Sequence, residues 1–269
     1  MGGALVLLVA VLLFGAEIYG GRRWLWFFQP SEISKLAVIL FVAHLFGRSG
    51  RESFKWFLAG ALVLGVPALL ILKEPDLGTA LVLVPAGTAM LLAARVWTKG
   101  LVALLLVGLL AAGTVLGTVF IAEQTPDPAR RAQISIGSGS VWGKGLRKGS
   151  QKTLGYLPPS VSMNDFIFAV LAEESGFRGT LTMLALFLGV LLTGTRIAFR
   201  ATDDRGRLVA VGTTTLVFCH LYVNVAMSIG LMPITGLPLP FISAGRSFLV
   251  TLLAALGVVQ SVAVHREEE

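Results

Sequence analysis

The chain has 269 residues, of which 55% are hydrophobic and only 14% are charged. With a mean hydropathy of +0.81, it has too few polar side chains to cover a water-soluble globule, which indicates a protein of the lipid bilayer. The net charge of +7 comes from Lys and Arg residues scattered over short connections between apolar runs, so nucleic-acid binding is not expected. Anionic membrane lipids or a phosphorylated lipid are the expected partners.

Eight apolar segments are long enough to cross the membrane as helices, each crossing taking about 20 residues. They are residues 3–19, 31–47, 56–72, 77–94, 99–121, 176–199, 206–230 and 239–264. We therefore expect an all-α fold: a polytopic transmembrane helical bundle that forms one integral membrane domain, 1–269. Pro30 is expected at a helix start, where its missing N–H costs nothing, and Pro75 in a short connection.

Basic residues set the expected orientation. If the long polar connection at 122–164 is set aside, they concentrate on the side of the 200–207 turn and the C-terminus, which the positive-inside rule places in the cytoplasm. The long connection then faces outward despite its own basic residues, which favours an anionic ligand over a merely solvated loop. These residues are Arg130, Arg131, Lys144, Arg147, Lys148 and Lys152.

The segment that follows this connection is too long for one span. From Asp165 to Phe199 it is compatible with helix throughout, which at 1.5 Å per residue gives about 50 Å, well beyond a bilayer core. We expect a break at Ser175–Gly176 that leaves a short helix, 165–174, at the membrane surface. Non-helical backbone at this depth is tolerated only against protein or a water-filled cavity, so the break hints at a site.

Ionisable side chains in such a chain are costly and are therefore functional candidates. Glu32 and Lys35 lie three residues apart on one helix face; a charged cavity wall and a structural ion pair are equally good interpretations. Asp165 ends the basic connection, and its position alone fits a helix N-cap, a general base or a metal ligand.

Two further groups have alternative interpretations. Glu173, Glu174 and Arg178 straddle the expected break, where mutual pairing is at least as good an interpretation as catalysis. His220, Tyr222 and Asn224 are expected to hydrogen-bond between helices rather than to catalyse.

The stretch 230–247 combines Pro, Gly and hydroxyl residues, which favours re-entrant or unwound backbone before the last span. Ser243 and Arg246 lie at its end. Arg246 suits bidentate binding of a pyrophosphate, or a position at the membrane interface with its stem in the apolar region.

Five stretches together resemble the motifs of the SEDS family (shape, elongation, division and sporulation), which comprises RodA- and FtsW-type proteins. GRRWLWFFQPSEISK at 21–35 resembles the family's GxRRW and FQPSE-xxK motifs, and EPDLGTA at 74–80 resembles QPDLGT. IGSGSVWGKG at 136–145, NDFIFAVLAEESGF at 164–177 and GLPLPFIS at 236–243 resemble IGSGG…GKG, TDFIFAV with AEELG, and GxPLPFxS. The matches occur in order over nearly the whole chain.

The sequence also departs from the family pattern. Family members generally have ten spans and the pattern here starts at the third, so two helices are expected to be absent or to belong to a longer gene product. Residues 160–164 read SVSMN where the family usually has Glu-Arg-His-Thr, and 244–246 read AGR in place of Tyr-Gly-Gly. Both changes alter the outer cavity.

The resemblance implies a peptidoglycan glycosyltransferase that polymerises lipid II at the outer face of the bacterial cytoplasmic membrane, for cell shape, elongation or division. A class B penicillin-binding protein is the implied partner, and a divalent cation, Mg²⁺ or Mn²⁺, the implied cofactor. Asp165 becomes the essential catalytic carboxylate. The substrate-binding residues implied for the lipid cavity and the pyrophosphate are Glu32, Lys35, Lys144, Arg147, Lys148, Ser243 and Arg246. Two alternatives stay open: a lipid II flippase that uses the same cavity, and an inactive scaffold for a penicillin-binding protein.

Overall fold

The computed structural model describes residues 1–18, 21–24, 29–48, 53–96, 127–146, 148–149 and 164–265. The chain divides into two compact units, each built from separate stretches of sequence. The first unit comprises 1–106, 191–219 and 246–269, and the second comprises 107–190 and 220–245. The organisation as one domain over 1–269 stays a prediction.

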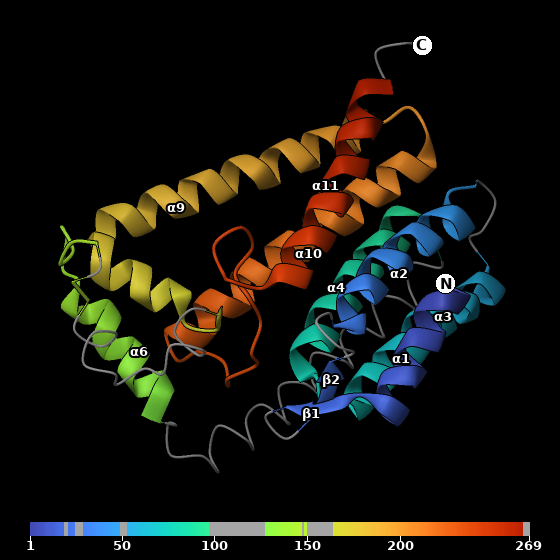
Figure 1. The fold of residues 1–269 in the computed structure, drawn as a ribbon. Helices are drawn as coiled ribbons and strands as arrows, with labels where there is room; N and C mark the ends of the chain where they lie inside the picture. Colours follow the sequence, from blue (N-terminus) through green and yellow to red (C-terminus); the bar gives the residue numbers. More distant parts are fainter. Residues whose placement is uncertain are drawn as a thin grey trace. The chain divides into compact units, whose positions relative to one another are not determined.

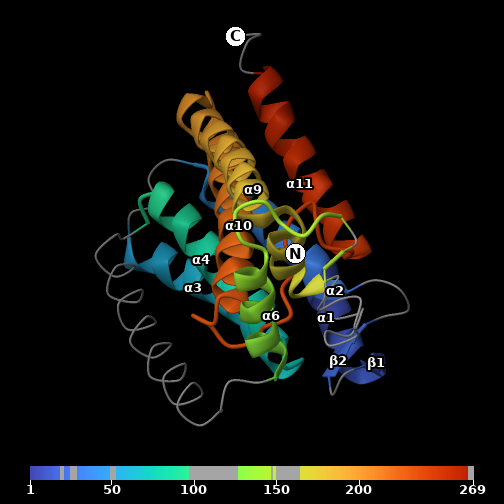
Figure 2. The ribbon, with the colours of Figure 1, turned by 90° about the vertical axis from the view of Figure 1, so that its left-hand side faces the viewer.

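The first unit contains a helical bundle of α1 (Gly2–Phe14), α2 (Pro30–Phe46), α3 (Phe54–Lys73) and α4 (Leu77–Ala93). Helix α2 contacts α1, α3 and α4 and also α11 (Arg246–His265), and Figures 1 and 2 show α3 and α4 side by side. Val42 of α2 and Leu83 of α4 are buried in this bundle, whereas Leu62 and Leu69 of α3 are exposed. An exposed apolar face of this kind is the surface expected to meet lipid.

Two local predictions in this bundle are confirmed. Helix α2 begins at Pro30, and Pro75 lies in the connection between the end of α3 and the start of α4. In the same connection Asp76 caps α4: one carboxylate oxygen accepts from the Thr79 backbone nitrogen at 3.1 Å and the other from the Thr79 hydroxyl at 2.8 Å.

A short antiparallel hairpin follows α1 and was not expected. It pairs β1 (Ala16–Ile18) with β2 (Gly21–Trp24), so the first predicted span, 3–19, ends in the structure at Phe14. Gly15 adopts an extended conformation and ends the helix. A longer apolar helix would also have to carry the charged residue Glu17 into the membrane, which is costly. The rest of the described chain has no other strand, and the all-α class is confirmed.

Most predicted spans coincide with helices where the structure describes them, but the predicted span 239–264 is helical only from Arg246, because its first residues belong to a non-helical loop. Among the described residues, α3, α9 (Ile167–Arg200), α10 (Asp204–Ser228) and α11 are long and apolar enough to cross a membrane, and α1 and α4 are shorter apolar helices. Helix α2 covers the predicted span 31–47. The predicted span 99–121 lies outside the described residues.

The second unit contains α6 (Asp127–Ser138), the first part of α9, the last part of α10 and residues 229–245, here called the proline-rich loop. Helix α6 lies inside the predicted connection 122–164, which showed no obvious structure in the sequence. Its Ala129 and Ala132 pack against Phe166, Ala169 and Met227. Ile136 of α6 packs beside this cluster, but the fully buried residues of α6 are small, so the helix lacks the run of large apolar residues by which spans are recognised.

Helix α9 is broken at Gly176, where φ is 67° and ψ is −168°, and Figure 1 shows its two pieces meeting at an angle. The predicted break at Ser175–Gly176 is confirmed. Residues 139–145 pass beside it and supply backbone partners: Lys144 N–H donates to Glu173 O and Phe177 N–H donates to Ser140 O, both at 2.9 Å. The non-helical backbone is therefore satisfied by protein, as such backbone must be within a membrane protein.

Candidate functional site

Asp165 lies in a turn, residues 164–166, immediately before α9, and is half-buried. Its carboxylate faces the proline-rich loop at Gly236, because a Cβ built on Gly236 would lie 3.9 and 4.0 Å from the two carboxylate oxygens. Gly236 has a φ of 68°, a conformation that favours glycine. A side chain at position 236 would therefore be strained by the backbone conformation, although its Cβ would make only an ordinary contact with the carboxylate.

Asn224 of α10 fastens this turn to the proline-rich loop. Its Nδ2 donates to the backbone oxygen of Asp165 at 2.9 Å and to that of Leu237 at 2.7 Å. The Asn224 side chain is fully buried. One amide group thus bridges the candidate carboxylate and the loop that faces it.

Ser243 holds the same turn from the other side. Its hydroxyl donates to the backbone oxygen of Asn164 at 2.7 Å and accepts from the Leu239 N–H at 2.8 Å. Ser243 donates its single hydroxyl proton to the backbone oxygen of Asn164, so it has no second proton to donate to a substrate. In this arrangement the residue predicted to bind substrate holds protein backbone.

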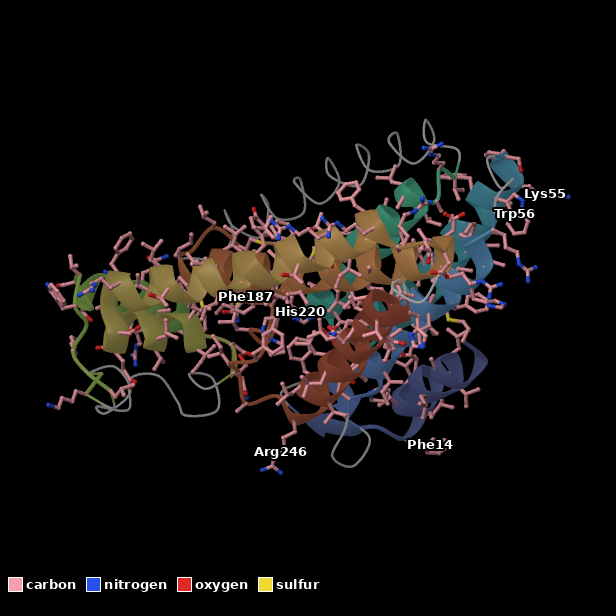
Figure 3. The ribbon with its side chains drawn as sticks, turned by 90° about the horizontal axis from the view of Figure 1, so that it is seen from above. Phe14, Lys55, Trp56, Phe187, His220 and Arg246 are labelled. Carbon is pink, nitrogen blue, oxygen red and sulfur yellow. The ribbon has the colours of Figure 1, made fainter. Side chains whose placement is uncertain are left out.

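Two other side chains hold the proline-rich loop. The Nδ1 of His220 lies 3.1 Å from the backbone oxygen of Pro238, and the ring centroids of Phe187 and Phe241 are 6.1 Å apart; His220 and Phe187 are labelled in Figure 3. His220 and Asn224 do act as hydrogen-bonding groups, as predicted. Among the described contacts, His220 lies beside a backbone carbonyl of the proline-rich loop, and Asn224 donates to carbonyls of that loop and of the turn.

Lys144, a predicted pyrophosphate ligand, forms an ion pair with Glu173. Its Nζ lies 2.7 Å from Glu173 Oε1 and 2.8 Å from the Ser138 hydroxyl, and the Ser135 hydroxyl donates to Glu173 Oε2 at 2.8 Å. The Glu173 side chain is only 1% exposed and that of Lys144 is 30% exposed. Much of the Lys144 charge is therefore already balanced by protein.

The interpretation that Glu173, Glu174 and Arg178 pair with one another at an exposed break is wrong for Glu173, which is buried and paired with Lys144. Arg178 lies instead over the ring of Trp142, 4.4 Å from its centroid. The break at Gly176 separates these residues, because it ends the helical spacing that would place them on one face.

The other predicted cationic ligands differ in placement. Lys148 is exposed, and Arg147 lies outside the described residues. Arg246, in the first unit, is the first residue of α11 and is exposed, and Figure 3 shows its side chain projecting away from the ribbon. Within the described part of the chain, neither Lys148 nor Arg246 has an ion-pair partner.

In the first unit, Glu32 and Lys35 form a buried ion pair, with Lys35 Nζ 2.8 Å from Glu32 Oε2 and side chains only 3% and 2% exposed. Lys35 Nζ also lies 5.1 Å from the centroid of the Phe248 ring. Glu74 and Asp76 are buried as well, and Asp76 accepts from the Gln29 side chain at 2.9 Å. Such a concentration of buried charge fits both a cavity wall and a structural ion pair.

Sequence reasoning missed three of these residues. Asn224 was not connected with Asp165, and Asp76 and Glu74 were noted only as part of a motif. A Glu-Pro-Asp sequence between two apolar spans signals buried charge that needs partners, which points to Glu74 and Asp76. Nothing in the sequence indicates which carbonyls Asn224 binds.

A family model described as cell cycle protein, FtsW, RodA and SpoVE, matches residues 1–268. The peptidoglycan glycosyltransferase MrdB of Escherichia coli K12 is 37% identical over 98% of this chain and 76% of its own length. The probable peptidoglycan glycosyltransferase FtsW of Geobacter sulfurreducens KN400 is 34% identical over 98% of this chain and 76% of its own.

Solved structures of related proteins have a similar fold. The rod shape determining protein RodA of Thermus thermophilus superimposes with a TM-score of 0.75 at 30% identity, over 99% of this chain and 76% of that chain. A chain from a peptidoglycan synthase complex that coordinates polymerization and crosslinking gives a TM-score of 0.80 at 27% identity, over 100% of this chain and 80% of that chain. The chain therefore belongs to the FtsW, RodA and SpoVE family, the SEDS family that its motifs resemble.

Proposed function

We infer that this chain is a peptidoglycan glycosyltransferase that polymerises lipid II into glycan strands, with Asp165 as its catalytic base. The observation that carries this inference is the half-buried Asp165 carboxylate in a turn held at two successive carbonyls by Asn224 and Ser243. A catalytic group needs such a fixed position. The relatives named as peptidoglycan glycosyltransferases support the same reaction.

In the proposed reaction the Asp165 carboxylate accepts the proton of the acceptor sugar hydroxyl. That oxygen forms a bond to the anomeric carbon of the lipid-linked donor, while the bond from this carbon to the pyrophosphate oxygen breaks. Undecaprenyl pyrophosphate leaves with the electron pair, and a single displacement inverts the anomeric carbon. A general base supplies roughly 10²- to 10⁴-fold in rate, so stabilisation of the leaving group must supply more.

The cations proposed for the leaving group are not equivalent. Lys148 and Arg246 are exposed, which leaves their charge available, whereas Lys144 is paired with Glu173. We assign the main electrostatic contribution to Lys148, which belongs to the same unit as Asp165; Arg147 and Arg246 remain proposed from the sequence. Glu32 and Lys35 are proposed to line the lipid cavity.

A divalent cation, Mg²⁺ or Mn²⁺, belongs to the proposal as a companion of the pyrophosphate. No group of three His, Cys, Asp or Glu side chains suited to a metal occurs among the described residues. Mg²⁺ is commonly held by one or two carboxylates together with substrate phosphates and waters, so the pyrophosphate itself would supply most of the ligands. The cation would supply charge neutralisation to the leaving group.

The proposed setting is the bacterial cytoplasmic membrane, with the C-terminus in the cytoplasm and the reaction at the outer face. The charge bias of the short connections supports this orientation. A class B penicillin-binding protein is the proposed partner, and the likeness to a chain of a peptidoglycan synthase complex supports it.

Purified protein with labelled lipid II and Mg²⁺ or Mn²⁺, with and without the class B partner, tests the proposal. We expect glycan polymer from the wild type and a loss of at least about 10²-fold for Asp165→Ala and Asp165→Asn, because each removes the base. Thr182→Ala is the matched control: Thr182 is an exposed α9 position whose hydroxyl donates, among the described residues, to Arg178 O within its own helix. Lipid II scrambling across vesicles without polymer would favour a flippase, and neither activity would favour a scaffold.

A further inference from the structure

We propose that Asn224 is a positioning residue for the glycosyl transfer: it acts through Asp165 by fixing the turn that carries the carboxylate. This inference rests on the proposed function of Asp165. Asn224 is fully buried on α10 and lies in the second unit with both of its hydrogen-bond partners.

The two hydrogen bonds donated by Asn224 require a side-chain amide at this position. Asn224 Nδ2 donates to Asp165 O at 2.9 Å and to Leu237 O at 2.7 Å, so both protons of the amide nitrogen are used. Both partners are carbonyl oxygens, which only accept hydrogen bonds, and this fixes the orientation of the amide. A side chain without two donors on one atom cannot make the same bridge.

The bridge joins the turn that carries the Asp165 carboxylate to the proline-rich loop that faces it. Leu237 follows Gly236, the residue that faces the Asp165 carboxylate. Ser243 provides a second attachment, because its hydroxyl donates to Asn164 O, one residue before Asp165, at 2.7 Å. Loss of the Asn224 bridge removes one of these two attachments, so the Asp165 backbone is held less firmly against the facing loop although Ser243 still joins the loop to the turn.

The structure predicts an effect on turnover rather than on binding. A misplacement of about 1 Å in a catalytic group costs about 10²-fold in rate. We therefore expect Asn224→Leu and Asn224→Ala to lower kcat of lipid II polymerisation by about 10²-fold, with KM within about threefold of wild type. Asn224→Gln, which keeps both donors on a side chain one methylene longer, should recover part of this loss.

Ser228→Ala is the matched control for a buried polar group on the same helix. Ser228 is fully buried, and in the part of the chain that the structure describes its hydroxyl donates to the backbone oxygen of Asn224, one turn back, at 2.9 Å. It should leave kcat unchanged, although it lowers the melting temperature in detergent. Asn224→Leu is the main test because it keeps most of the volume and avoids the cavity that Asn224→Ala creates.

Coupling to Ser243 provides the second measurement. If both residues act on the same turn, the double variant Asn224→Leu/Ser243→Ala should lose less kcat than the product of the two single losses. A folded Asn224→Leu protein with wild-type kcat, or losses that multiply independently, would overturn the inference. Full activity in Asp165→Ala would instead overturn the proposed function, so the two failures are distinguishable.

Discussion

At the scale of single residues, the pair of Glu173 and Lys144 shows how a buried carboxylate constrains a cation that sequence alone assigns to substrate. A carboxylate with a 1% exposed side chain requires a partner, since an unpaired buried charge is strongly unfavourable. Lys144, Ser135 and Ser138 meet this need. Lys144 therefore stabilises the broken helix, and Lys148, which is exposed, is the better candidate for the pyrophosphate.

The two lysines should consequently respond differently to substitution. Lys144→Met removes the cation that pairs with the buried Glu173 carboxylate, and we expect a destabilisation of about 3 kcal/mol, at the lower end for a buried pair because Lys144 is partly exposed. Lys148→Met should leave the melting temperature unchanged and raise KM for lipid II about tenfold, as expected for one lost contact to a charged group. Thermal unfolding in detergent and polymerisation kinetics measure both effects. A stable Lys144→Met protein with a raised KM would reverse the assignment.

The sequence singles out Asp165 by its position but not by its surroundings. The partners that hold its turn come from distant parts of the chain: Asn224 is 59 residues from Asp165, and Ser243 is 79 residues from Asn164. Local spacing predicts that Asn224 makes hydrogen bonds. Which carbonyls it reaches depends on tertiary packing, which a pattern within one helix does not contain.

At the scale of elements, the break in α9 was predictable because two independent constraints agree. A continuous helix would be longer than a bilayer core is thick. Gly176 lies where a span of normal length, counted back from the end of α9, would begin, and glycine tolerates a break in the helix. Helix α6 and the β1–β2 hairpin were not predictable in the same way. Helix α6 buries mainly small side chains against Phe166. The strands of the hairpin are too short to show a periodic pattern.

Gly176→Ala should be strongly destabilising. Its φ of 67° and ψ of −168° lie in a region essentially restricted to glycine, at a cost of about 1–3 kcal/mol for other residues. A Cβ there would also lie 2.7 Å from Val141 O, closer than real Cβ contacts allow. We expect a loss of at least about 3 kcal/mol in unfolding free energy, measured as a fall in melting temperature in detergent.

Gly189→Ala in the same helix is the matched control. A Cβ at Gly189 would meet nothing within 4 Å, and alanine favours helix by about 0.5–1 kcal/mol over glycine. It should therefore leave the melting temperature unchanged or raise it. Equal melting temperatures for the two variants would show that the closely packed backbone at the break contributes little to stability.

At the scale of the whole molecule, hydropathy predicted the order of the spans in the described part of the chain, because the thickness of the bilayer core sets the length of each apolar run. It did not predict the buried charges of the first unit. Glu32, Lys35, Glu74 and Asp76 are all buried, although each lies at or beside the start or end of an apolar run, where exposure is the simplest expectation. Their burial follows from the packing of α2 and α4, which composition does not reveal.

Orientation is the whole-molecule property that the charge pattern predicts most directly. Cys219 is buried, so Cys219→Ser provides a background for single cysteines at exposed positions. Leu146 is 83% exposed in the connection expected outside, and Thr202 is exposed in the 200–207 turn expected in the cytoplasm. We expect Leu146→Cys to react with a membrane-impermeant maleimide in intact cells, and Thr202→Cys to react only after permeabilisation, because basic short connections are retained in the cytoplasm. The opposite labelling pattern would place Asp165 on the cytoplasmic side, where a reaction at the outer face is impossible.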